Sequence, residues 1–136
     1  MAPVSVVPGW LAKAFDCLAA GDVEGWAGIY APDAVHEFPF AAEEDERRIE
    51  GRNAIAARLR EVFDAAQGRL RFGSFDNVLA REAGDEIVIE GDGHHRTIDG
   101  EPVEIRCVWF ITRRDGQVTH FRDYMNPLTL GTHQLM

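Results

Sequence analysis

Four charged or titratable side chains recur at two-residue intervals near the middle of the chain: Glu90, Asp92, His94 and Arg96. The strand-forming residues Ile-Val-Ile come directly before them, at positions 87–89. Because successive side chains of a strand point to opposite faces of a sheet, the four would share one face. Histidine titrates near neutral pH and carboxylates exchange protons, so this face could perform acid–base chemistry. The alternative is a face exposed to water.

A further acid, Asp123, stands between Phe121 and Met125 on one face of the last predicted strand. An apolar setting raises the pKa of a carboxyl group toward the range useful for proton transfer. The alternative is an aspartate that ends the strand and caps the following turn. We predict that Asp123 is the general acid or base, assisted by Asp92 and His94.

Other side chains are candidates for contact with a substrate. Glu37 precedes Phe38-Pro39 in an early strand, where it could face either the interior or the outside. Glu90 could instead pair with Arg106 on the next strand, which is a structural role. The predicted substrate-binding residues are Trp26, Glu37, Phe38, Glu90, Arg106, Phe121 and Met125.

The sequence has no recognisable metal or phosphate motif. Its five histidines show no i, i+4 pair with a third ligand, and there is no glycine-rich phosphate loop and no Gly-x-Ser-x-Gly motif. We therefore expect no metal and no cofactor, and chemistry limited to acid–base steps.

The composition of the chain limits the classes of partner that it could bind. A formal charge of −9 and a pI near 4.9 argue against nucleic acid and against an anionic membrane surface. No run of about 18 apolar residues could span a bilayer, and the first ten residues do not resemble a secretory signal. Cys17 and Cys107 show no metal-type spacing and are expected to be a buried, reduced pair. The cysteines favour a cytoplasmic protein, and the acidity says little about a small neutral ligand.

The order of predicted elements indicates an α+β fold. Helices are expected over about 9–20, from a cap at Asp22 through Tyr30, and from a cap at Asn53 to Gly68; a turn at 31–34 and a short strand separate the last two. Four strands should follow, over 70–81, 86–97, 103–113 and 118–125, joined by turn-type sequences. We expect one domain over 1–136, in which a curved, mostly antiparallel sheet wraps around about three N-terminal helices as a cone that can hold a ligand.

Three segments, "AGDVEGWAGIYAPDAVHEFPF", "GRNAIAARL" and "GQVTHFRDYMNPL", resemble the SnoaL-like and ketosteroid-isomerase-like branch of the nuclear-transport-factor-2-like superfamily. The resemblance implies the same cone-shaped fold, a deep apolar pocket and a homodimer. It also implies cofactor-free isomerisation, cyclisation, dehydration or condensation of a small hydrophobic metabolite, as in secondary metabolism.

Comparison of single positions within that superfamily leaves several activities open. The three groups of steroid isomerases would fall at Phe38, Ala14 and near Val108, so classical steroid isomerisation is not expected. Limonene-type epoxide hydrolases resemble the chain at Asp92 and Asp123 but have arginine where this chain has Glu90.

Phenazine-biosynthesis A/B-type proteins carry motifs similar to "EGDGHHR" and "FRDYMNP", with a catalytic glutamate at the position of Asp123. An epoxide hydrolase and a non-catalytic ligand-binding protein are therefore the alternatives to an isomerase or cyclase.

Overall fold

The computed structural model describes residues 7–41, 47–66, 71–97 and 99–124. Helices and a short hairpin edge come first and the long strands follow, which makes an α+β fold, as predicted. The elements in chain order are α1 (Gly9–Ala19), α2 (Val23–Ala27), β1 (Tyr30–Glu37), β2 (Arg48–Glu50), α3 (Arg52–Ala66), β3 (Arg71–Ala83), β4 (Glu86–Arg96), β5 (Pro102–Arg114) and β6 (Gln117–Asp123).

The strands form one curved sheet in the order β2-β1-β6-β5-β4-β3. Neighbouring strands are antiparallel, except that β1 and β6 run parallel. The β3–β4 and β5–β6 hairpins turn at Gly84 and at Asp115-Gly116, where φ is positive, a conformation that glycine and aspartate tolerate better than most residues. The antiparallel meander predicted for the second half of the chain is confirmed.

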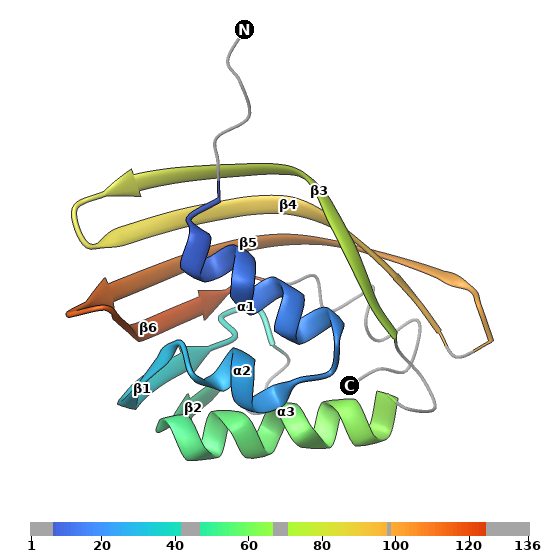
Figure 1. Cartoon of the computed structure of the whole chain (residues 1–136), viewed down its shortest axis with the longest axis horizontal. Coiled ribbons are helices and arrows are strands. Elements are labelled where there is room, and N and C mark those ends of the chain that lie inside the picture. The colour runs from blue at the N-terminus through green and yellow to red at the C-terminus, as the bar shows by residue number, and fades with distance from the viewer. Residues whose placement is uncertain (1–6, 42–46, 67–70, 98, 125–136) are drawn as a thin grey trace, which may run out of the picture.

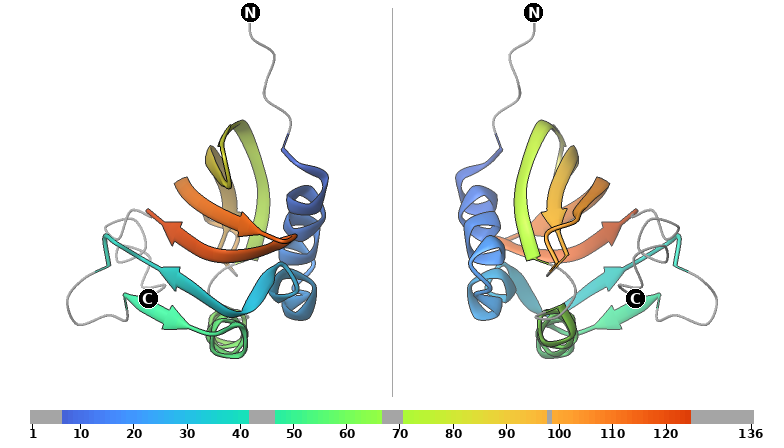
Figure 2. Two further views of the ribbon diagram at one scale, coloured as in Figure 1. Left: turned by 90° about the vertical axis from the view of Figure 1, so that its left-hand side faces the viewer. Right: turned by 90° about the vertical axis from the view of Figure 1, so that its right-hand side faces the viewer.

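Helices α1 and α2 lie on one side of this sheet, and α3 runs beside β1 and β2 (Figure 1; Figure 2). Helix α1 turns Leu11, Ala14 and Leu18 toward the sheet, a spacing typical of an amphipathic helix. The Asp22 carboxylate accepts a hydrogen bond from the Gly25 N–H (3.0 Å) and caps α2, as predicted. Sheet and helices together form the expected cone.

The start of β1 differs from its prediction. Tyr30, expected in the second helix, is the first residue of β1, and the turn expected at 31–34 lies within that strand. The register between β1 and β6 shifts between Tyr30 and Val35. This irregular stretch holds Pro32, which has no N–H for a sheet hydrogen bond and therefore gives a turn-like sequence signal inside a strand.

The segment after β1 also differs. The sequence did not predict β2, whose three residues pair with β1 from Val35 to Glu37. Helix α3 begins at Arg52, one residue before the predicted cap Asn53. Its predicted end, Gly68, lies outside the described residues.

Aromatic rings pack against one another between the sheet and the helices. Phe15 of α1 lies 5.1 Å from Phe75 and 5.5 Å from Trp109, and Trp109 lies 5.3 Å from Phe121, as centroid distances. Such aromatic pairs add to the free energy gained by burying their area. The interior is therefore built by rings from the first helix and from three strands.

The two cysteines and the lengths of the helices bear on two further expectations. Cys17 and Cys107 are both free thiols, but Cys17 is only half-buried, so the expected buried pair is wrong for that residue. Among the described residues, no helix combines the length and the apolar character that crossing a membrane requires.

Candidate functional site

Strand β5 shows that the two predicted acids, Asp92 and Asp123, lie on opposite faces of the sheet. Asp92 of β4 is paired with Arg106, and Asp123 of β6 is paired with Trp109. Arg106 and Trp109 are three residues apart on a strand whose register with β4 is continuous, so they point to opposite faces. Trp109 is buried, which makes its face the interior one. The predicted convergence of Asp92 with Asp123 is wrong.

The polar face of β4 is the outer face, and its groups form ion pairs with neighbouring strands. Asp92 accepts a hydrogen bond from Asn77 (2.9 Å) and contacts the guanidinium of Arg106 (3.2 Å). Arg106 is itself 88% exposed, so its predicted contact with substrate is wrong. Glu90 pairs with Arg81 of β3, at 3.4 Å, and not with Arg106 as predicted. It therefore also lies on the outer face.

His94 shares this outer face with the carboxylates that flank it. Its Nε2 lies 2.9 Å from Asp76 and its Nδ1 2.5 Å from Glu104. Two hydrogen bonds raise the pKa of His94; the one to Asp76 has the larger effect and the one to Glu104 the smaller. The predicted partnership of His94 with Asp123 is wrong, because the imidazole links β3, β4 and β5 on the opposite face.

Glu37 also faces outward. Its carboxylate is hydrogen-bonded to His120 of β6, and it lies 3.8 Å from Arg48 of β2. His120 is paired with Thr112, an even number of residues from Arg106 along β5, so both belong to the outer face. Of the two orientations that the sequence left open, Glu37 therefore has the outward one. Its predicted contact with substrate is wrong.

Asp123 lies on the interior face. Its Oδ1 accepts a hydrogen bond from the indole Nε1–H of Trp109 (3.1 Å). Burial raises the pKa of Asp123 to about 7, and the Trp109 hydrogen bond, which favours the charged form, acts in the opposite direction. A carboxyl group with a pKa near 7 can both accept and donate a proton at neutral pH.

Three of the other predicted substrate contacts, Trp26, Phe38 and Phe121, lie in or against the core. Phe121 is buried and lies two residues before Asp123 on β6. The ring centroid of Trp26, in α2, lies 6.3 Å from that of Phe121, and Phe38 packs against the same core. These three face the interior, and their contact with a substrate stays a prediction. Met125 lies outside the described residues.

The structure adds two interior polar residues that the sequence did not single out. The Tyr30 hydroxyl lies 2.9 Å from the Nδ1 of His36, and both side chains are buried. Burial lowers the pKa of His36 to about 3, with the charge of His120 acting in the same direction. Burial also raises the pKa of Tyr30. One signal was available: His36 and Phe38 alternate with Glu37, so an outward Glu37 implies an inward His36.

Two glycines of β4 make room for neighbouring groups on the interior face. A Cβ on Gly93 would lie 3.1 Å from the Phe75 ring and 2.6 Å from His95 Nε2. A Cβ on Gly91 would lie 3.3 Å from Val78. The close approach of another group, one of the readings that glycine in a strand suggests, is what the structure shows.

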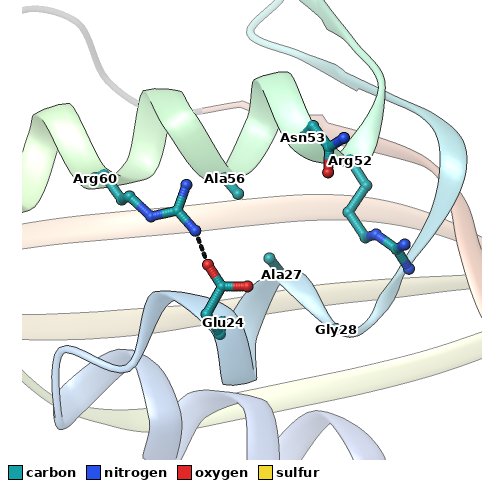
Figure 3. A pocket seen from close by; sticks show the side chains of 7 residues that line it. All are labelled: Glu24, Ala27, Gly28, Arg52, Asn53, Ala56 and Arg60. Carbon is teal, nitrogen blue, oxygen red and sulfur yellow. Dashed lines mark ion pairs between the residues drawn. The ribbon is translucent and has the colours of Figure 1, made fainter.

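Two surface pockets lie apart from Asp123. One, of about 310 Å³ between α2 and α3, contains the ion pair between Glu24 and Arg60 (Figure 3). The other, of about 340 Å³, lies at the ends of β3, β4 and β5 and includes His94. The first has its arginines engaged, since Arg52 also donates to the carbonyl of Tyr30 (3.5 Å). The chemistry of Asp123 therefore makes the interior the stronger candidate site.

The chain belongs to the SnoaL-like domain family, which it matches over residues 11–121. It is 32% identical to an uncharacterized PhzA/B-like protein of Pseudomonas aeruginosa over 82% of this chain and 77% of that protein. It is equally similar to the uncharacterized protein YesE of Bacillus subtilis, over 80% of this chain and 74% of YesE. The predicted membership of the SnoaL-like branch is confirmed.

Solved structures agree with this assignment. A candidate isomerase from Bacillus subtilis superposes with a TM-score of 0.80 at 27% identity, over 92% of this chain and 89% of that chain. A candidate polyketide cyclase from Xanthomonas campestris gives 0.72 at 19% identity, over 92% and 93%. An LEH-like epoxide hydrolase of M. tuberculosis gives a TM-score of 0.67 at 20% identity, over 93% of this chain and 86% of that chain. The last two likenesses show the fold alone.

Proposed function

We propose that this protein catalyses cofactor-free proton transfer on a small hydrophobic metabolite, with Asp123 as the general acid and base. The observation that carries the proposal is the Asp123 carboxyl group among aromatic rings, with a pKa raised to about 7 and one oxygen oriented by Trp109. Near neutral pH such a group can remove a proton from carbon and return it elsewhere. The name of one similar protein, the candidate isomerase from Bacillus subtilis, supports this reaction class.

The placement of the other acids favours one carboxylate over two. An epoxide hydrolase with Asp92 and Asp123 on either side of a water would need both on one face, and β5 separates them. The reaction proposed is therefore a proton shuttle by Asp123, of the kind that isomerisation or cyclisation requires.

The test is deuterium uptake by 2-tetralone, an enolisable aromatic ketone, in D2O, followed by mass spectrometry. The wild-type protein should accelerate exchange, and Asp123→Asn should lower the catalysed rate by roughly 100-fold or more. Asp92→Asn is the matched control, because it removes a carboxylate from the outer face of the same sheet. The proposal fails if the wild-type protein does not accelerate exchange, or if Asp123→Asn exchanges as fast as wild type. An apolar ligand bound without exchange would instead indicate a carrier.

A further inference from the structure

A buried histidine in the interior has one ring nitrogen with no hydrogen-bond partner among the described residues. His36 is 8% exposed and stacks on Phe121, with ring centroids 4.5 Å apart and planes 12° apart. Its Nδ1 lies 2.9 Å from the Tyr30 hydroxyl, whereas its Nε2 has no hydrogen-bond partner in the described part of the chain. Buried polar atoms are nearly always paired, so an unpaired one calls for an explanation such as a missing ligand atom.

The Tyr30 phenol determines which nitrogen of His36 carries the hydrogen. Burial raises the pKa of Tyr30 and lowers that of His36, so the phenol is protonated and the imidazole is neutral. If the phenol donates to Nδ1, only the Nε2–H is unpaired. In the reverse arrangement, the phenol O–H and the Nε2 lone pair would both be unpaired within the described chain. Because each unpaired buried group is costly, Nε2 is the protonated nitrogen.

The surroundings of this donor define the ligand that it fits. The rings of Phe38 and Phe121 lie 4.7 and 4.5 Å from the imidazole ring. Aromatic faces bind flat apolar molecules, and a neutral N–H among them pairs with a carbonyl or enolate oxygen. A ligand that carries its own carboxylate is disfavoured, because Asp123 lies on the same interior face.

The donor and the acid are near each other along one strand. His36 pairs in register with Phe121 of β6, and Asp123 follows two residues later on the same face, about 7 Å along the strand. The charge of Asp123 also acts on Tyr30, the partner of His36. A flat ligand between these groups would therefore present its oxygen to one of them and a neighbouring carbon to the other.

We propose that the His36 Nε2–H, oriented by Tyr30, is the hydrogen-bond donor for the carbonyl oxygen of a flat, uncharged, enolisable ketone. The inference rests on the proposed role of Asp123 for its chemical step. The Asp123 carboxylate takes the α-proton, the C–H electron pair forms the new C=C bond, and the carbonyl π electrons move to the oxygen held by His36. The proton then returns from Asp123 to carbon, so no electrons leave the substrate. Phe38, which is only partly buried, lies 4.7 Å from the imidazole ring, between centroids.

The test compares 2-naphthol, which mimics a flat enol, with naphthalene, which has the same rings and no oxygen. Fluorescence titration gives both dissociation constants for the wild type and for His36→Phe, which keeps the ring stack and removes the donor. We expect 2-naphthol to bind roughly 10-fold more weakly to His36→Phe, and naphthalene to bind equally to both. His36→Gln, whose amide N–H can replace the donor, should recover part of the loss. Tyr30→Phe should weaken the binding of 2-naphthol but not that of naphthalene, as expected of a positioning residue.

Each result decides the inference. If His36→Phe binds 2-naphthol as tightly as the wild type does, or if the wild type binds neither probe, the inference is wrong. If circular dichroism shows that His36→Phe does not fold, His36→Gln and Tyr30→Phe still distinguish recognition of the ligand oxygen from recognition of the ring shape.

The exchange assay distinguishes this inference from the proposed function. Loss of exchange in Asp123→Asn, with unchanged naphthol binding in His36→Phe, would retain the function and overturn the inference. A wild type that catalyses no exchange but discriminates 2-naphthol through His36 would retain the hydrogen-bond donor and overturn the function.

Discussion

At the scale of single residues, the interior position of the Asp123 carboxyl group makes the stability of the fold depend on pH. Its pKa is about 7 in the folded protein, against about 3.9 in an unfolded chain. Between these values the folded protein holds a proton that the unfolded chain has released, so stability is lost as pH rises through this window. Above pH 7 the charged carboxylate is the form that can remove a proton.

Replacing Asp123 by Asn should therefore stabilise the protein while it abolishes proton transfer. At pH 8 we expect the free energy of unfolding to rise by on the order of 2 kcal/mol, because no charge is buried. At pH 4 the two proteins should be nearly equal, since wild-type Asp123 is then protonated. Urea denaturation at both pH values measures the difference. A variant less stable than wild type at pH 8 would contradict a desolvated Asp123.

Residue types alone could not show which face of β4 is inside. The period of two correctly grouped Glu90, Asp92 and His94, but a strand with mixed residues on both faces allows either orientation. Beyond Ile89 the interior face of β4 carries Gly91 and Gly93, which are buried yet give no hydrophobic signal. Nothing in the sequence therefore indicated that the face with the conspicuous titratable groups is the outer one.

The position of Asp123 was easier to predict. Phe121 beside it is a strong interior marker, and the structure places both on the interior face. The inward side of β1, with His36, could not be chosen from the sequence, because Glu37 and His36 are both titratable and alternate along the strand.

At the scale of elements, long periodic segments were predictable and short, irregular ones were not. Helix α1 and strands β3 to β6 agree with prediction to within a few residues, since each buries a regular apolar face. The three-residue strand β2 has one buried residue, Ile49, and too little periodicity to detect. The first half of β1 contains Pro32, which gives a turn-like signal, and the pairings with β6 at Tyr30 and from Val35 onward lie on either side of it.

The glycines of β4 are a constraint at this scale, and Gly93→Ala tests it. The new Cβ would lie within 3.0 Å of the Ile105 carbonyl oxygen and close to the rings of His95 and Phe75. We expect a loss of about 1–3 kcal/mol in the free energy of unfolding, as for other overpacked interiors. Gly9→Ala is the control, because its Cβ meets nothing within 4 Å at the start of α1. Thermal denaturation measures both, and equal melting temperatures would contradict close packing at Gly93.

At the scale of the whole molecule, one curved sheet separates two kinds of chemistry. The interior face carries aromatic rings and the carboxyl group of Asp123, whereas the outer face carries ion pairs that join one strand to another. Exposed pairs of this kind contribute little to stability individually. Part of the outer face is instead aromatic: Phe110 and Phe40 lie 5.4 and 5.2 Å from Tyr124, and Phe40 is 61% exposed.

This outer aromatic cluster of Phe40, Phe110 and Tyr124 is where we predict that two copies of the chain meet, since an exposed apolar patch is typical of an interface. Phe40→Glu should raise the dimer dissociation constant by roughly 10-fold or more, because it buries a charge in the contact. Ala83→Glu adds the same charge at an exposed site on β3 and should leave association unchanged. Since each copy carries a formal charge of −9, raising NaCl from 20 to 300 mM should strengthen the wild-type dimer by screening repulsion. Light scattering after size exclusion measures all three effects, and a monomeric wild type at every concentration and salt would exclude this interface.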